Sequence, residues 1–271
     1  MSAIEDRAAE GWRSTGWTDS RNVSQMLYFL WAMGEIMVAG RSGGKKLWEL
    51  TERFLPDWAP RDELSWEEIA PRITQRSLKA LGAATEGQIR KHYVRNCYPR
   101  LPEVLAELES EGAIERVDIM GSEGLRALRG TWYVHAEDFP LLDRLEEGDW
   151  GHRTTLLSPF DNLISDRRRT RQVLGFQYGF ELYTPKEKRR YGAYVMPILR
   201  GGRLIGRIDP KMDRGQETLN INAVYAEPDA PMDVDTASEV ATTIDDLMMF
   251  LGAEEVVYGD RIPEGWKGAL G

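Results

Sequence analysis

The stretch SWEEIAPRITQRSLKALGAATEGQIRKHY, residues 65–93, decides the fold predicted for the middle of this chain. Ser65, followed three residues later by Glu68, has the spacing of a capping box, so a helix is expected to begin here and to run through ITQRSLKALGAA. Thr85 and Glu86 then open a second, shorter helix over GQIRKHY. The stretch therefore predicts two consecutive helices with a short connection.

The segments that follow complete this unit. Pro102 opens a third helix, PEVLAELESEG, and Gly112 ends it. AIERVDIM, the turn GSEGLR and TWYVHA then have the patterns of a strand, a wing and a second strand. Three helices followed by a two-stranded wing are the order of a winged helix, a variant of the helix-turn-helix, and we predict a complete one over residues 61–140.

The third helix of this unit is acidic on the side that would meet solvent. In a DNA groove it would repel the phosphates, so we expect it to serve as a scaffold or to contact protein instead. The carboxylates are those of Glu103, Glu107, Glu109 and Glu111.

The same outline recurs in part over residues 1–60. Thr18, Asp19 and Ser20 offer N-cap oxygens to the run RNVSQMLYFLWAMG, which Gly34 closes, and EIMVAG, RSGG and KKLWEL follow as strand, turn and strand. We predict here a winged helix that the sequence shows only in part; the alternative is an α+β fragment with a core helix and a solvated hairpin. The expected core face of the helix consists of Val23, Met26, Leu27, Leu30, Trp31 and Met33.

Residues 141–271 are rich in strand signals. A short helix, PLLDRLEEGDW, is followed by the strand-like runs TLLSP, FELYTP, AYVMPIL, RLIGRID and TLNINAVYAE, with a two-glycine hairpin signal at residues 200–203. Residues 235–250 form an amphipathic helix, and VVYG could return one last strand. We predict an antiparallel β domain or partial barrel closed by a helix, with a loose tail after Gly259. The fold class is thus α+β, with tandem winged helices before this domain.

Charge is strongly segregated along the chain, although its net value is −9. Residues 151–214 carry 14 basic and 6 acidic groups, or +8, whereas residues 215–271 carry 2 and 12, or −10. A basic block on an acidic protein favours a polyanion surface, because clustered cations repel one another unless water or an anion offsets them. The alternative for any single arginine is a pair with a nearby carboxylate such as Asp161 or Asp166. Asp161 could also activate water beside such a surface, but it more readily caps a turn.

Several function classes have no support in the sequence. The only cysteine, Cys97, excludes an internal disulfide, and the three histidines are too far apart for a recognisable zinc motif, so we predict no metal and no cofactor. The sequence has no P-loop, dinucleotide fingerprint or nucleophile elbow. Without a signal peptide or a bilayer-spanning run, the cytoplasm, in association with the nucleoid, is the predicted location, and a membrane is not a predicted partner.

Three stretches carry a family resemblance. Residues 157–171, residues 189–214 (RRYGAYVMPILRGGRLIGRIDPKMDR) and residues 31–56 (WAMGEIMVAGRSGGKKLWELTERFLP) are similar to the AlkZ/YcaQ-like winged-helix DNA glycosylases. This resemblance implies tandem winged helices and a C-terminal β domain around a concave DNA channel. It also implies excision of alkylated bases and unhooking of DNA interstrand crosslinks without a metal or an organic cofactor.

The motif that positions the attacking water in that family does not occur in this sequence. It reads Gln-hydrophobic-Gln or Gln-hydrophobic-Asp and lies in a first, N-terminal winged helix, so the chain is expected to begin at the family's second winged helix. The glutamines Gln25, Gln75, Gln88, Gln172, Gln177 and Gln216 all lack Gln or Asp two residues on. No catalytic residue is carried over: the chain is either an incomplete gene product or a relative that keeps DNA binding and has lost or moved the chemistry.

We predict double-stranded DNA as the partner. The alternatives are a non-enzymatic winged-helix transcription regulator and a protein-interaction module. The surface that would face a missing domain could be covered by a second copy of the chain or by another protein. The residues expected to form this surface are Trp12, Trp17, Tyr28 and Trp31. The candidate DNA-binding residues are Arg21, Asn22, Gln25, Arg41, Lys45, Lys46, Arg167, Arg168, Arg169, Arg171, Lys188, Arg189 and Arg190.

Overall fold

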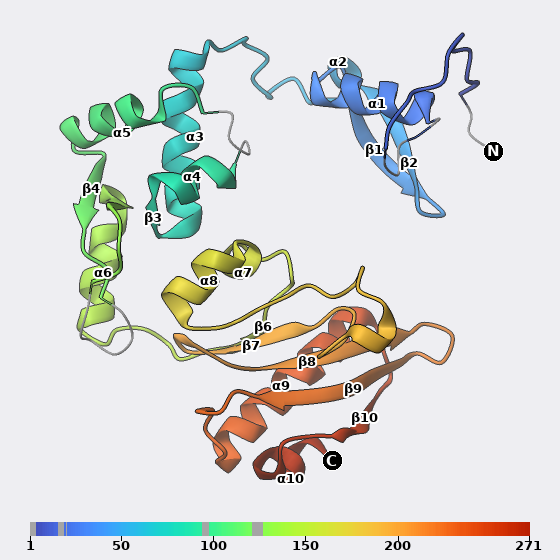
Figure 1. Cartoon of the computed structure of the whole chain (residues 1–271), viewed down its shortest axis with the longest axis vertical. Coiled ribbons are helices and arrows are strands. Elements are labelled where there is room, and N and C mark those ends of the chain that lie inside the picture. Colours follow the sequence, from blue (N-terminus) through green and yellow to red (C-terminus); the bar gives the residue numbers. More distant parts are fainter. Residues whose placement is uncertain (1–3, 16–18, 20, 94–97, 121–126) are drawn as a thin grey trace. The chain divides into compact units, whose positions relative to one another are not determined.

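The computed structural model describes residues 4–15, 19, 21–93, 98–120 and 127–271. The chain has a mixed α+β fold in two compact units, residues 1–64 and 65–271 (Figure 1). The predicted division at residues 60 and 140 stays a prediction.

The first unit is a helix followed by a hairpin, as predicted. The turn Gly43-Gly44 has φ angles of +51° and +79°, the conformation that a tight two-residue hairpin requires and that glycine adopts without strain. The N-cap position is Arg21, without a side-chain cap; Asp19 instead accepts the amide of Ser14 at 3.0 Å, and Thr18 and Ser20 lie outside the described residues. The elements are α1 (Asn22–Ala32), β1 (Ile36–Ser42), β2 (Lys45–Leu50) and α2 (Thr51–Phe54).

The expected core face of α1 is not buried, which corrects that prediction. Met26, Trp31 and Met33 are 48%, 49% and 72% exposed, and α1 has no buried residue. One helix over a two-stranded hairpin has too little surface to enclose large side chains. Ile36 is the single buried apolar residue among the described part of this unit. The unit therefore exposes an apolar surface.

The second unit begins with the helices predicted from residues 65–93. Ser65 and Glu68 form the capping box, with the Glu68 amide donating to Ser65 Oγ at 3.3 Å. The first helix ends at Leu81 rather than continuing through Ala84, because residues 83–85 pair with β5. An antiparallel sheet of order β3-β5-β4 covers the helices. The elements are α3 (Trp66–Leu81), β3 (Ala83–Thr85), α4 (Glu86–His92), α5 (Leu101–Ser110), β4 (Ile114–Val117) and β5 (Trp132–His135).

These elements enclose a core of their own. Its fully buried members come from each of the three helices and from both sheet edges, and they include Leu78, Ile89, Leu105, Ile114 and Ala84. The predicted turn GSEGLR, residues 121–126, lies outside the described residues. A short helical segment, η1 (Ala136–Asp138) and α6 (Phe139–Glu146), leads to the next sheet.

The C-terminal sheet has five strands in the order β10-β9-β8-β7-β6. Its edge strand β10 runs parallel to β9, which corrects the prediction of an antiparallel domain. The 18-residue helix α9 connects these two strands, and a crossover of this length is what a parallel pair requires. The elements are β6 (Thr154–Leu156), β7 (Met196–Arg200), β8 (Arg203–Asp213), β9 (Thr218–Ala226), α9 (Val234–Leu251) and β10 (Glu255–Arg261).

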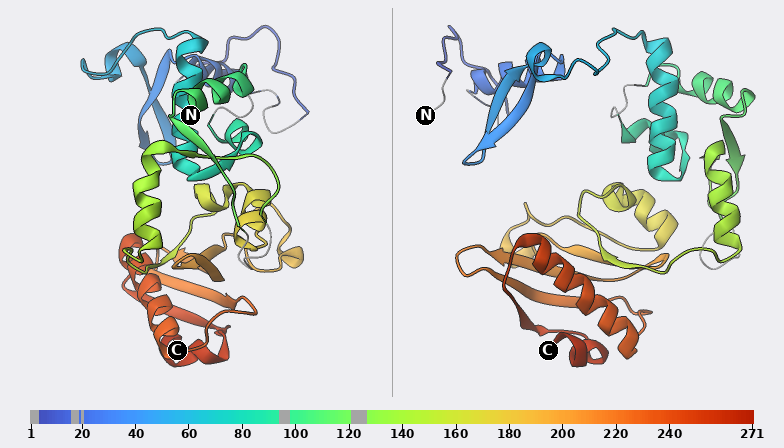
Figure 2. Two further views of the ribbon diagram at one scale, coloured as in Figure 1. Left: turned by 90° about the vertical axis from the view of Figure 1, so that its left-hand side faces the viewer. Right: turned by 180° about the vertical axis from the view of Figure 1, so that it is seen from behind.

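Two layers cover this sheet. On one face α9 packs over Ile205, Ile208 and Ile221. On the other face, residues 157–195 cover a separate cluster that includes Leu204 and Ile164 and carry α7 (Asn162–Ser165), α8 (Arg167–Leu174) and η2 (Lys186–Lys188). Figure 2 shows α9 and the pair α7–α8 on opposite sides of the strands.

Two further expectations for this region are wrong. The run FELYTP, residues 180–185, forms turns rather than a strand. The tail after Gly259 is not loose: it forms η3 (Glu264–Trp266) and α10 (Lys267–Leu270), and both Trp266 and Leu270 are fully buried beside α9. A large indole that completes a core fixes the segment that carries it. Within the described residues, every helix is too short or too polar to cross a bilayer.

Candidate nucleic-acid interface

The arginine block of residues 167–171 lies on α8, a helix that was not predicted from the sequence. Asp166 is its N-cap and accepts the amides of Arg168 at 3.0 Å and Arg169 at 3.2 Å. Gly175, with φ +65°, ends the helix in the left-handed conformation. An N-cap aspartate and a C-terminal glycine were both visible in the sequence, but the apolar periodicity between them is weak.

Two of the four arginines point into the protein. Arg169, only 6% exposed, donates from Nη2 to the carbonyl oxygens of Leu81 at 2.7 Å and Ala83 at 3.1 Å. These carbonyls end α3 and begin β3, so Arg169 joins α8 to the neighbouring core. Burial lowers its pKa, although a guanidinium stays protonated at neutral pH.

Arg167 has a comparable inward role. Its guanidinium donates to the carbonyl oxygens of Pro159 and Ile164 and stacks on the ring of Tyr178, 4.5 Å from the centroid. Burial raises the pKa of Tyr178 to about 12, so the phenol is neutral and donates to the carbonyl of Val195 at 2.6 Å. Arg167 therefore fastens α8 to the segments before and after it in the chain, through Pro159, Ile164 and Tyr178.

The other two arginines, Arg168 and Arg171, face solvent. Their side chains make no hydrogen bond or ion pair with any residue that the structure describes. Both line a groove between α8 and α4, made of two adjoining hollows of about 550 and 740 Å³. Arg168 lines both hollows and Arg171 the second. Guanidiniums in this position can donate from their planar forks to phosphate oxygens in the groove.

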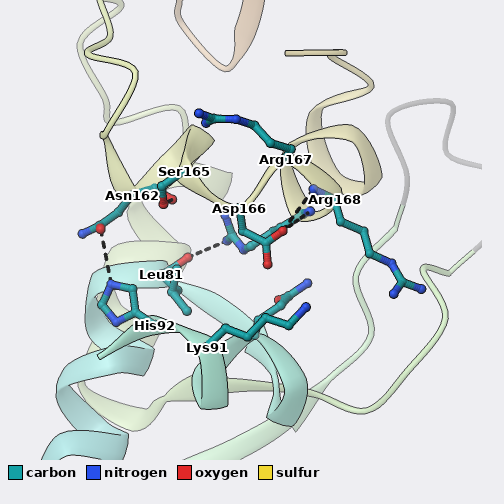
Figure 3. Close-up of a pocket in the computed structure, with 10 residues that line it drawn as sticks. Leu81, Lys91, His92, Asn162, Ser165, Asp166, Arg167 and Arg168 are labelled. Carbon is teal, nitrogen blue, oxygen red and sulfur yellow. Dashed lines mark hydrogen bonds between the residues drawn. The ribbon is translucent and has the colours of Figure 1, made fainter. Parts of the chain in front are cut away.

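The opposite wall of the groove comes from α4 and residues near it. His92 Nε2 lies 3.3 Å from Asn162 Oδ1 and connects the two walls. Figure 3 shows Lys91 and His92 on one side, and Asn162, Ser165, Asp166, Arg167 and Arg168 on the other. The cations that α4 and the segment before β5 add, Lys91 and Arg129, were not among the residues predicted from the sequence. A basic last turn in GQIRKHY was the available signal, but nothing in the sequence placed it opposite α8.

The second basic stretch, residues 186–190, is split in the same way. Arg189 donates to the carbonyl oxygens of Thr184 at 2.8 Å and Leu182 at 3.2 Å and so closes its own loop. Arg190 lies over the ring of Tyr191, 4.8 Å from the centroid, and Lys188 is exposed. Neither Arg190 nor Lys188 pairs with a carboxylate among the described residues, so both can meet an anion.

Other cations of the basic region are paired. Glu239 of α9 accepts from Arg200 at 2.9 Å, and Arg203 and Arg207 pair with Asp229 and Glu227. Asp161 accepts the amide of Leu163 at 2.8 Å and so caps α7. Capping is the role that the sequence favoured for Asp161 over water activation.

In the first unit, the candidate residues have mixed surroundings. Asn22 donates to Asp6 at 2.8 Å and accepts the amide of Trp12, so its amide group is already engaged. Lys46 lies over the rings of Trp31 and Trp48, 5.7 and 5.2 Å from the centroids. The remaining candidates are Arg21, Arg41 and Lys45, which are exposed, and Gln25, which is half-buried.

The family model described as DNA glycosylase AlkZ-like matches residues 1–250 of this chain. The chain therefore belongs to the AlkZ-like DNA glycosylase family, and that family acts on DNA. No solved structure shows a significant match to this chain. The resemblance noted from residues 31–56, 157–171 and 189–214 is thus confirmed.

Proposed function

We propose that this AlkZ-like chain binds double-stranded DNA, with the phosphate backbone held in the groove between α4 and α8. The family match supports DNA as the partner. The observation that carries the proposal is the pair Arg168 and Arg171, which are exposed and unpaired among the described residues and line that groove. Phosphate contacts of this kind position a protein on a duplex without reading its sequence.

We also assign a winged helix to the elements α3 to β5. Their order and the antiparallel sheet β3-β5-β4 support it. The helix α1 with the hairpin β1–β2 supports a second, partial winged helix in the first unit. The acidic helix α5 has its glutamates on the exposed side, and Glu109 pairs with Arg116 at 2.7 Å. The glutamates of α5 favour DNA contact through α4 instead.

The binding proposal is tested by the salt dependence of duplex affinity. Removal of one phosphate contact should flatten the slope of log affinity against log salt by about 1, so Arg168→Ala with Arg171→Ala should flatten it by about 2. The matched control is Arg144→Ala with Arg203→Ala, which changes the net charge equally but removes cations paired with Asp149 and Asp229. A salt-insensitive interaction would contradict the proposal. Arg169 is unsuitable for this test because it is buried.

Two activities are compatible with this binding. One is excision of an alkylated base, which the family resemblance implies. The other is DNA binding without excision, which the absence of Gln or Asp two residues after any glutamine favours. Incubation with methylated and crosslinked duplexes, followed by measurement of free base and abasic sites, decides between them. Sequence-selective footprinting without base release would indicate a transcription regulator.

The exposed apolar surface of the first unit supports a protein contact there, by a second copy or by another protein. Trp12, Tyr28 and Trp31 are 39%, 53% and 49% exposed, whereas Trp17 lies outside the described residues. Patches of this kind mark interaction surfaces. A monomeric species in light scattering, together with no binding of a hydrophobic dye, would count against this contact. The cytoplasm is the proposed location of such a complex.

A further inference from the structure

A second hollow lies apart from the groove, within the same unit. Its volume is about 720 Å³, and it shares no lining residue with the groove. Cavities of about 300–1,000 Å³ are typical of small-ligand sites. Its walls come from η2 and the loop after it, the second half of β8, and strands β9 and β10. We call it the Asp209 pocket, after the carboxylate that lines it.

The loop that forms one wall is fixed from within. Glu181 accepts the backbone amides of Arg190 at 3.0 Å, Tyr191 at 2.9 Å and Gly192 at 3.2 Å. Tyr225 Oη donates to the carbonyl of Tyr191 at 3.2 Å from the opposite wall. The pocket is therefore formed before any ligand arrives, which reduces the entropic cost of binding.

The carboxylate of Asp209 lies directly against this loop. It accepts from Asn222 Nδ2 at 3.1 Å and from the backbone amide of Tyr194. Gly192 has φ +149°, and a Cβ there would lie 2.2 Å from Asp209 Cγ, so only glycine permits the approach. Burial raises the pKa of Asp209, in spite of these hydrogen bonds. A carboxylate so placed can accept a hydrogen bond from a ligand N–H.

Cations surround this single carboxylate of the pocket lining. Lys186 and Lys211 have no carboxylate partner among the described residues. Arg261 lies over the ring of Tyr225, 5.4 Å from the centroid, and Arg190 over that of Tyr191. Cations gathered around a hollow favour an anionic ligand.

The carboxylate, the cations and the tyrosine rings of the pocket together favour one class of ligand. A free phosphate would satisfy the cations, but the carboxylate of Asp209 would repel it and it cannot stack on the guanidinium planes of Arg190 and Arg261. A nucleotide has an anionic phosphate and a flat base that can stack on guanidinium planes and aromatic rings. The base also has N–H groups that can donate hydrogen bonds to a carboxylate. We infer that the Asp209 pocket binds one deoxynucleotide, with its phosphate at Lys186 and Lys211. Its base lies against the guanidinium planes of Arg190 and Arg261, which cover the rings of Tyr191 and Tyr225, and Asp209 accepts a hydrogen bond from a base N–H. The biological setting of this inference rests on the proposed DNA binding.

Calorimetric titration of the full chain with 5′-dGMP, deoxyguanosine and inorganic phosphate tests the pocket directly. The mononucleotide should bind about tenfold more tightly than either fragment. Lys211→Glu should weaken its binding about tenfold, whereas Arg214→Glu, on the same hairpin but outside the pocket lining, should leave it unchanged. Asp209→Asn should reduce the advantage of the nucleotide over phosphate, with circular dichroism as the check on folding.

Three results would overturn the inference that the Asp209 pocket binds a nucleotide. They are no binding of 5′-dGMP, binding no tighter than that of phosphate, and binding that neither Lys211→Glu nor Asp209→Asn alters. The double variant Arg168→Ala with Arg171→Ala separates this inference from the proposed function. It should lose duplex affinity and retain mononucleotide binding. If the chain binds 5′-dGMP but no duplex, only the proposed duplex binding in the groove is wrong. If it binds duplex but not 5′-dGMP, only the inferred nucleotide binding in the Asp209 pocket is wrong.

Discussion

The basic segments 167–171 and 186–190 each carry four cations in five residues, but they have different connections to the rest of the fold. In α8, Arg169 bonds carbonyls 88 and 86 residues away and joins two hydrophobic cores. In the second segment, Arg189 bonds carbonyls 5 and 7 residues away and closes one loop. We infer that the structural effect of an inward guanidinium depends on how far along the chain the bonded carbonyls lie from the arginine. The local charge density does not decide it.

The largest effect is expected from Arg169→Met. The substitution removes two charge-assisted hydrogen bonds and leaves the carbonyls of Leu81 and Ala83 without their partner, so the free energy of unfolding should fall by about 3 kcal/mol. Urea denaturation of the full chain measures it, and separate transitions for the two cores would show that the connection was broken. Arg171→Met, on the exposed side of α8, should change it by less than about 0.5 kcal/mol. Equal effects of the two variants would remove the distinction between inner and outer arginines.

A smaller effect is expected from Asp166→Ala. Loss of the N-cap of α8 should cost about 1 kcal/mol, because the amides of Arg168 and Arg169 lose their acceptor. Asp166→Asn should restore most of the stability, since asparagine is an equally good N-cap. Thermal unfolding of both variants tests this, and an asparagine variant as unstable as the alanine one would point to charge rather than capping.

The local connection of Arg189 should matter less to the whole protein. Arg189→Met should lower the global free energy of unfolding by no more than about 1 kcal/mol while amide exchange in the loop at residues 190–192 accelerates. Hydrogen exchange read by mass spectrometry resolves the two effects. Lys188→Met is the control, because that side chain is exposed. Global destabilisation as large as that of Arg169→Met would break the comparison between the two segments.

The smallest effect is a dependence of the loop on pH through Glu181. Burial raises the pKa of Glu181, but hydrogen bonds from the amides of Tyr191, Arg190 and Gly192 outweigh it and hold the pKa below its ordinary 4.5. A carboxyl with a lowered folded-state pKa stabilises the fold above pH 4.5, and this contribution disappears as the pH falls through the lower value. The melting temperature of the wild type should therefore exceed that of Glu181→Gln at neutral pH, and the gap should close in acid. A constant gap would show that the charge of Glu181 has no part in it.

Local signals account for the features that were predicted correctly from the sequence. The capping box at Ser65 and Glu68, the glycine turn of the first hairpin and the amphipathic helix α9 each depend on residues close together in the chain. The helix α8 was missed because its inward side carries Arg169 and Thr170 in place of an apolar stripe. Alternating apolar residues in FELYTP suggested a strand, but the turns there are held by contacts such as Arg189 to Leu182.

The candidate site could be predicted only in part for the same reason. Composition located the basic segments, yet it could not separate Arg168 and Arg171 from the inward Arg167 and Arg169. That separation depends on which carbonyls lie within reach after folding. The groove's second wall and the Asp209 pocket bring together residues from distant elements, which a charge count along the sequence does not reveal.

The burial of Trp266 and Leu270 affects the order in which the chain can fold while it is being synthesised. The core around α9 needs both side chains, so it cannot be completed until residue 270 has left the ribosome. The core between α3 and β5 uses residues 70–133 and is available much earlier. At translation rates of about 5–20 residues per second, the interval is roughly 10 s. During that time the carbonyls of Leu81 and Ala83 are already in place for Arg169, and the core around α9 is completed last.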